Sequence, residues 1–272
     1  MATRKRERSD EENIALSDPL QYAMRRLQEA ERTGARELDL SKLDLGPLLR
    51  GDWGGWEILG RLDKLKDLNL SENQITEIPS AGWEAIGRLA RLSDLRLHEN
   101  QMTEITAQGW ESLGQLGWLS WLDLSGNGLT SIPKVGWDAL GRMSELDHLY
   151  LQSNQIGDLP VEGWQKLGRL TKLSHLFLSR NRLVMVEEGW QALGRLTNLK
   201  GLSLGSIRKD FRYGVGGTRP AHQAGLPASC EKPNRRHSSG GLECTEWVGQ
   251  SNLALRNSQS SRDHSGGRMG GT

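Results

Sequence analysis

Two groups of polar residues in this 272-residue chain have the types that hydrolytic chemistry requires. Residues 201–205 read Gly-Leu-Ser-Leu-Gly, which matches the G-x-S-x-G motif that holds a serine nucleophile on a sharp turn between a strand and a helix. Asp123, Ser125 and His148 supply the three residue types of a catalytic triad, although nothing in the sequence fixes an oxyanion site near them. A serine hydrolase using Ser203 is therefore one interpretation, and a Ser203 that lies inside a strand is the other.

The residue types give less support for a metal site or a phosphate-binding loop. His148 and His175 could both contact a metal ion, but no cysteine or carboxylate completes a set of three or four converging ligands beside them. The glycine-rich run at 214–218 lacks the Gly-Lys-Ser/Thr ending and the preceding strand of a phosphate-binding loop. We therefore expect no metal and no cofactor.

The elements that must position these residues recur at a fixed interval. Five asparagines lie 27 residues apart. Each ends the frame Leu-x-x-Leu-x-Leu-x-x-Asn and is followed two positions later by an apolar residue. They are Asn73, Asn100, Asn127, Asn154 and Asn181. The alternation Leu-x-Leu predicts a strand with one buried face, and strands this short are buried only when copies stack on one another.

The second half of each unit predicts a short helix. In one copy Trp83, Ile86 and Leu89 are three residues apart, which places them on one side of a helix. Tryptophan recurs at this place as Trp56, Trp83, Trp110, Trp137, Trp164 and, one residue early, Trp190. Because the recurrence follows the period, we expect the four from Trp83 to Trp164 to be buried between repeats.

This unit of strand, asparagine turn and helix resembles the leucine-rich repeat family, in its cytosolic type with a 27-residue repeat, over about residues 37 to 204. The resemblance implies an α/β solenoid shaped as a right-handed horseshoe, with a parallel sheet on the concave side and short helices on the convex side. It also implies that the five asparagines form a ladder whose side chains satisfy backbone groups of the turns, which is a structural role.

Four segments follow from this interpretation. Residues 1–17 are expected to be a disordered N-terminus. Residues 18–36 are expected to form an N-terminal capping helix, because Asp18 and Pro19 precede an apolar stripe that ends at Gly34. Residues 37–207 hold the repeats, and residues 208–272, which are rich in Gly and Ser without a period, are expected to be a disordered tail or the product of a shifted reading frame.

The side chains between the strand leucines are expected to face away from the core, on the concave side. Neighbouring strands lie about 4.8 Å apart, so the aromatic and histidine side chains of three successive repeats should form one patch. Trp and Tyr are enriched among the residues that dominate interface energies, which favours a binding surface. The alternative is that residues of high strand propensity occur on these strands by chance. The candidate partner-binding residues are Arg96, Trp121, Asp123, His148, Tyr150, His175 and Phe177.

These patterns predict a non-catalytic module that binds another protein. The net charge of +1 gives no reason to expect nucleic acid, and no run approaches the roughly 18 apolar residues of a membrane span. The charged start and the placement of Cys230 and Cys244 outside the repeats indicate the cytoplasm. The alternative is the recognition fragment of a larger signalling protein of GTPase or ubiquitin-ligase type, because residues 30–45 resemble the capped start of cytosolic leucine-rich repeat proteins.

Overall fold

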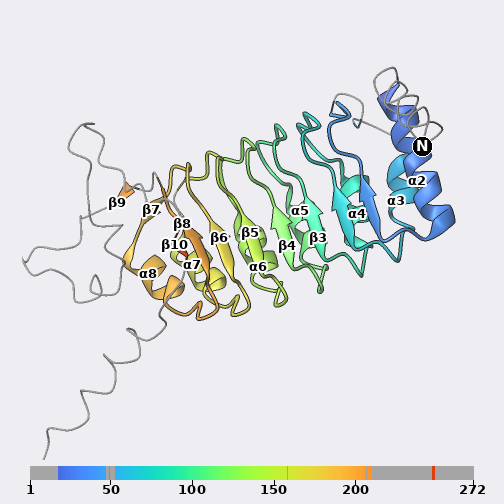
Figure 1. Ribbon diagram of the computed structural model, residues 1–272. Coiled ribbons are helices and arrows are strands. Elements are labelled where there is room, and N and C mark those ends of the chain that lie inside the picture. Colours follow the sequence, from blue (N-terminus) through green and yellow to red (C-terminus); the bar gives the residue numbers. More distant parts are fainter. Residues whose placement is uncertain are drawn as a thin grey trace, which may run out of the picture.

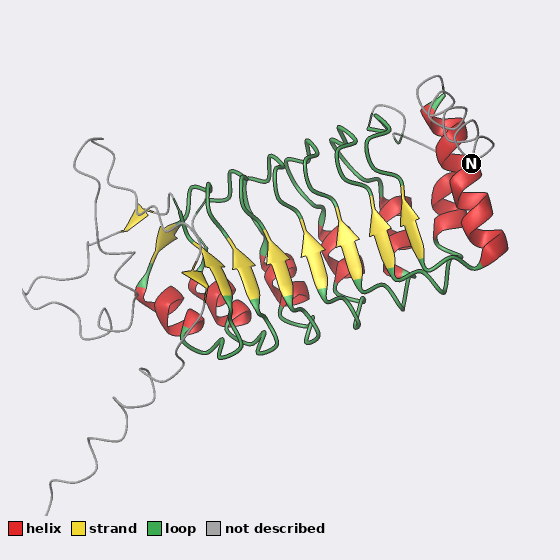
Figure 2. Ribbon diagram, in the orientation of Figure 1, coloured by secondary structure: helices red, strands yellow, loops and turns green. Residues whose placement is uncertain are grey.

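The chain is an open solenoid in which strands line one side and short helices line the other (Figures 1 and 2). The computed structural model describes residues 18–46, 49, 53–157 and 159–205, and the backbone of 208–209 and 247–248. The expected N-terminus at 1–17 and nearly all of the expected tail at 208–272 lie outside these residues. The predicted leucine-rich repeat architecture is confirmed.

The sheet is built from strands that each come from one repeat. Seven of the described strands run parallel and follow chain order: β1 (Glu37–Asp39), β2 (Asp67–Asn69), β3 (Asp94–Arg96), β4 (Trp121–Asp123), β5 (His148–Tyr150), β6 (His175–Phe177) and β8 (Gly201–Ser203). The register is the same from each of these strands to the next, so Leu68, Leu95 and Leu122 lie side by side. Outside this set, β10 (Trp247–Val248) runs antiparallel to β8, and β7 (Val184–Met185) pairs with β9 (Arg208–Lys209).

The helices that cover the other side of the sheet are short, because each must return the chain to the next strand. They are α3 (Gly55–Leu59), α4 (Ser80–Gly87), α5 (Ala107–Leu113), α6 (Lys134–Leu140), α7 (Val161–Leu167) and α8 (Glu187–Leu193). Proline precedes α4, α6 and α7, where its missing N–H costs no helical hydrogen bond. Among the described residues, no helix is both long and apolar enough to cross a membrane.

The helix expected at the N-terminal end is present as α2 (Pro19–Thr33). The Asp18 carboxylate accepts a hydrogen bond from the backbone N–H of Gln21, and Gly34 ends the helix in the left-handed conformation with a φ of 63°. Leu27 is fully buried where α2 packs against α3 and β1. The helix therefore covers the open end of the first repeat (Figure 1).

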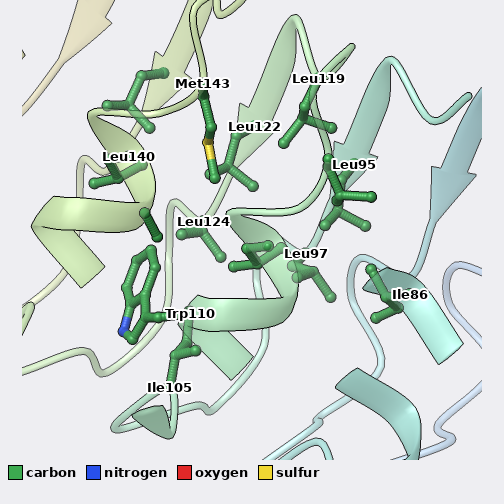
Figure 3. Close-up of a cluster of buried hydrophobic side chains, with 14 of the residues drawn as sticks. Ile86, Leu95, Leu97, Ile105, Trp110, Leu119, Leu122, Leu124, Leu140 and Met143 are labelled. Carbon is green, nitrogen blue, oxygen red and sulfur yellow. The ribbon is translucent and has the colours of Figure 1, made fainter. Parts of the chain in front are cut away.

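The core lies between the sheet and the helices and is filled by leucine and tryptophan (Figure 3). The strand leucines such as Leu95 and Leu122 have no exposed surface. Trp83, Trp110, Trp137 and Trp164 are at most 2% exposed, as predicted from their period. Burying a side chain of this size contributes on the order of 3 kcal/mol, so the tryptophans are the largest single contributors to the packing of the helices.

The asparagines lie in a row along the turns that follow the strands. The Oδ1 of Asn100 accepts hydrogen bonds from the backbone N–H groups of Asn73 and Ile75, both at 3.0 Å. Its Nδ2 donates to the carbonyl oxygens of Leu70 and Leu97, also at 3.0 Å. Each asparagine thus joins its own turn to the preceding one, and in the first repeat Leu43 takes the asparagine position and its N–H donates to Asn73.

Candidate functional site

The outward side chains of the strands form two columns, which we call the sheet face. Strand register gives the first column as Glu37, Asp67, Asp94, Trp121, His148, His175 and Gly201. It gives the second as Asp39, Asn69, Arg96, Asp123, Tyr150, Phe177 and Ser203. The leucine between the two columns is buried in six of the seven strands, and Leu202 of β8 is partly buried. Strand alternation therefore places both columns on the surface opposite the helices.

Five side chains from three neighbouring strands contact one another on this face, and we call them the ring cluster: Trp121, His148, Tyr150, His175 and Phe177. The centroids of the Trp121 and His148 rings are 4.3 Å apart at an interplanar angle of 20°, and those of His148 and His175 are 4.4 Å apart at 6°. Tyr150 lies 5.0 Å from Trp121 and 5.0 Å from Phe177. The first column is thus a continuous stack of three rings, flanked by a pair of aromatic rings.

The five side chains of the ring cluster are half-buried, and their rings contact one another. The Nε1 of Trp121 is enclosed without a hydrogen-bond partner, so stacking and not hydrogen bonding fixes this ring. Offset stacks of this kind contribute about 0.5–1.5 kcal/mol for each pair beyond their buried area. The cluster consequently presents a pre-ordered apolar surface that loses little side-chain entropy on contact with a partner.

Burial and neighbouring charges set the ionisation of the cluster. Partial burial lowers the pKa of His148 below its ordinary value of 6.5, and the adjacent His175 lowers it further. The Asp147 carboxylate acts in the opposite direction, with its Oδ2 2.8 Å from the Nδ1 of His148. Burial also raises the pKa of Tyr150. At neutral pH the side chains of His148 and Tyr150 are therefore uncharged.

The two charged candidates beside the cluster are held by contacts within the chain. Arg96 forms a two-pronged pair with Asp67, with Nη1–Oδ1 and Nη2–Oδ2 distances of 3.2 and 3.0 Å. Burial nevertheless raises the pKa of Asp67, against the attraction of Arg96. The Oδ1 of Asp123 accepts hydrogen bonds from the N–H and the hydroxyl of Ser125. Arg96 is thus directed toward β2 and away from the rings.

The structure does not bring together the side chains of the hydrolytic sites that the sequence suggested. The Ser125 hydroxyl donates to Asp123 at 2.6 Å, whereas His148 pairs with Asp147, so the three triad types do not form a relay. Ser203 lies within β8, in register with Phe177, and not on a turn between a strand and a helix. Within the described ranges, no group of three or more His, Cys, Asp or Glu side chains could hold a metal ion.

Two residues near the face were not singled out from the sequence. His98 follows β3, and its Nδ1 lies 3.3 Å from the Oδ2 of Asp123. Trp118 lies in the loop before β4 and is 67% exposed, unlike the other tryptophans of the repeats. The sequence contained a signal for the exposure of Trp118. The residues at the same position of other repeats are charged: Lys64, Arg91 and Lys172.

Comparison with known proteins matches the repeat unit itself. The family model described as Leucine Rich Repeat matches residues 64–84, which span β2, the Asn73 turn and the first part of α4. No curated protein matches the chain. An internalin from Listeria monocytogenes str. 4b F2365 is similar in its crystal structure, with 29% identity and a TM-score of 0.44 over 57% of this chain. The chain spans 39% of that protein.

The unit that matches the family model is repeated along the described chain. Each copy carries the same strand leucines in unbroken register, and five carry the ladder asparagine in its turn. This chain is therefore a leucine-rich repeat protein.

Proposed function

We propose that this protein is a cytoplasmic, non-catalytic scaffold that binds a protein partner on the sheet face, with the ring cluster at the centre of the contact. Leucine-rich repeats generally serve as protein–protein interaction modules, which supports this class of function. Arg96 and Asp123 lie at the border of the cluster and complete the proposed contact surface. A rigid aromatic centre with a polar border is the usual anatomy of an interface core and its rim.

The ring cluster carries this proposal because the fold does not require it. At the same two columns β2 has Asp67 and Asn69, and its leucine is buried as completely as those of β4 to β6. Small polar residues therefore satisfy the fold at these positions. A contiguous group of five rings on three neighbouring strands is explained better by selection for contact than by the needs of the sheet.

The test is to remove rings without disturbing the core. Trp121→Ala and Tyr150→Ala are expected to weaken partner capture by at least about 30-fold, which corresponds to a hot-spot loss of about 2 kcal/mol. Arg88→Ala and Arg142→Ala change exposed residues on the helix side and serve as matched controls. Capture is measured by quantitative mass spectrometry, and folding by circular dichroism. Loss of partners in the arginine variants, with full retention in the ring variants, contradicts the proposal.

A further inference from the structure

The charge of the sheet face changes along the solenoid. Over the two columns from β1 to β8 the side chains include five carboxylates, Glu37, Asp39, Asp67, Asp94 and Asp123, and one guanidinium, Arg96. Arg96 is already paired with Asp67. The ring cluster therefore adjoins a surface with an excess of negative charge, which attracts cations and repels phosphate groups.

Two of these carboxylates border the rings directly. Asp94 is the register partner of Trp121, one strand away at about 4.8 Å, and Asp123 is the register partner of Arg96 and Tyr150. One face of the Trp121 ring stacks on His148, at the end of the three-ring column. Trp121 is the end of this column that lies next to β3, where Asp94 is its register partner. An aromatic ring and a carboxylate thus meet at the border of the cluster.

This pairing is the surface that a cationic side chain prefers. A guanidinium or ammonium over a tryptophan ring is attracted by the ring's electrons, and a nearby carboxylate adds Coulomb attraction. The one basic side chain of the two columns, Arg96, forms its short contacts with Asp67 and only a long ion pair of 3.9 Å with Asp94. The Asp94 carboxylate also accepts a hydrogen bond from the Ser93 hydroxyl at 2.6 Å, and it retains acceptor capacity for a cation from a partner.

We infer that the partner presents an extended basic segment, whose arginine or lysine contacts Trp121 and Asp94 and whose next apolar side chain covers Tyr150 and Phe177. This inference rests on the proposed function and specifies the chemistry of the partner at the same face. The cation contacts β3 and β4 and the apolar residue contacts β5 and β6, so the two are two to three strand spacings apart, about 10–14 Å, which an extended peptide covers in about three to four residues. The cation and the apolar residue are therefore three to four positions apart.

A displayed library of random short peptides tests the inference with the full-length chain. Peptides are selected on the wild-type protein and counter-selected on the double variant Trp121→Leu and Tyr150→Leu, which restricts the survivors to the sheet face. We expect survivors to share an arginine or lysine three to four positions from an aromatic or aliphatic residue. Replacing that arginine with citrulline, which keeps its shape but not its charge, should weaken binding about 3- to 10-fold.

The carboxylate is tested with a matched pair of variants. Asp94→Asn should weaken the arginine peptide about 3- to 10-fold and should remove most of the difference between arginine and citrulline. Asp39→Asn makes the same change of charge on β1, three strands from Trp121, and should change binding less than about 2-fold. Circular dichroism confirms that both variants fold.

The outcomes separate this inference from the function on which it rests. Neutral or acidic survivors, or an arginine peptide unaffected by citrulline, overturn the basic segment and leave the sheet face as the binding surface. An equal loss in Asp94→Asn and Asp39→Asn overturns the specific pairing with Trp121. A selection that yields no peptide dependent on Trp121 and Tyr150 overturns both the inference and the proposed function.

Discussion

The indole ring of Trp110 lies directly against Gly136 of the next repeat. A methyl group on Gly136 would come within 2.9 Å of Cδ2 and Cε2 of that ring. The same closeness joins Trp83 to Gly109 and Trp137 to Gly163. The recurring Gly-Trp pair therefore has two roles, because each tryptophan fills the core while the glycine before it makes room for the tryptophan of the preceding repeat.

Gly136→Ala is expected to destabilise the protein by about 1–3 kcal/mol, because the Trp110 ring and the α6 helix must move apart. Alanine favours a helix over glycine by roughly 0.5–1 kcal/mol, so any measured loss is net of that gain. Gly117→Ala is the matched control, since nothing lies within 4 Å of a Cβ placed there. Chemical denaturation measures both free energies of unfolding. Equal effects at the two positions would show that the contact with Trp110 does not constrain the helices.

Trp137→Ala is expected to cost about 3–5 kcal/mol of the free energy of unfolding, because the ring is 2% exposed and its removal leaves a cavity between repeats. Trp118→Ala removes the same side chain from a position that is 67% exposed. We expect that variant to lie within about 0.5 kcal/mol of the wild type. Thermal and urea unfolding of the two variants check the contrast, and a small effect at Trp137 contradicts the packing described here.

Asn100→Ala is expected to cost at least about 1–3 kcal/mol, because it leaves buried N–H and carbonyl groups of two turns without partners. Gln101→Ala changes the neighbouring exposed residue and serves as the control. Amide hydrogen exchange adds a local measure, in which the N–H groups of Asn73 and Ile75 should lose protection first. Unchanged protection of these two groups would rule out their dependence on the Asn100 side chain.

The period determined what could be predicted from the sequence. The spacing of the leucines fixed which residues share a column, so the neighbourhood of Trp121, His148 and Tyr150 followed from counting alone. The pairing of Arg96 with Asp67 did not follow, because a long side chain chooses among neighbours by its rotamer and not by its place in the period. The fit of Trp110 against Gly136 also depends on how closely two helices approach, which spacing along the chain does not determine.

His148 is expected to make the stability of the protein fall as the solution becomes acidic. Its pKa in the folded protein lies below the ordinary value of 6.5, because partial burial and the stacked His175 disfavour the charged ring, against the attraction of Asp147 and Asp94. Well above pH 6.5 the imidazole is neutral in both states and contributes nothing to the pH dependence. Below it the unfolded chain binds the proton more readily, so the free energy of unfolding decreases until the pH falls below the folded pKa.

The measurement is urea denaturation between about pH 7.5 and pH 5.5, a window that contains the ordinary histidine pKa and lies above those of most carboxylates. His148→Phe is the matched variant, because it keeps a flat ring between Trp121 and His175 but cannot bind a proton. Groups away from the stack act on both proteins equally, so the difference between the two curves reports His148 together with its coupling to the neighbouring side chains. We expect the wild type to lose more stability than His148→Phe over this window. Parallel curves, or a wild type that gains stability in acid relative to the variant, would mean that the stack does not disfavour the charged imidazole.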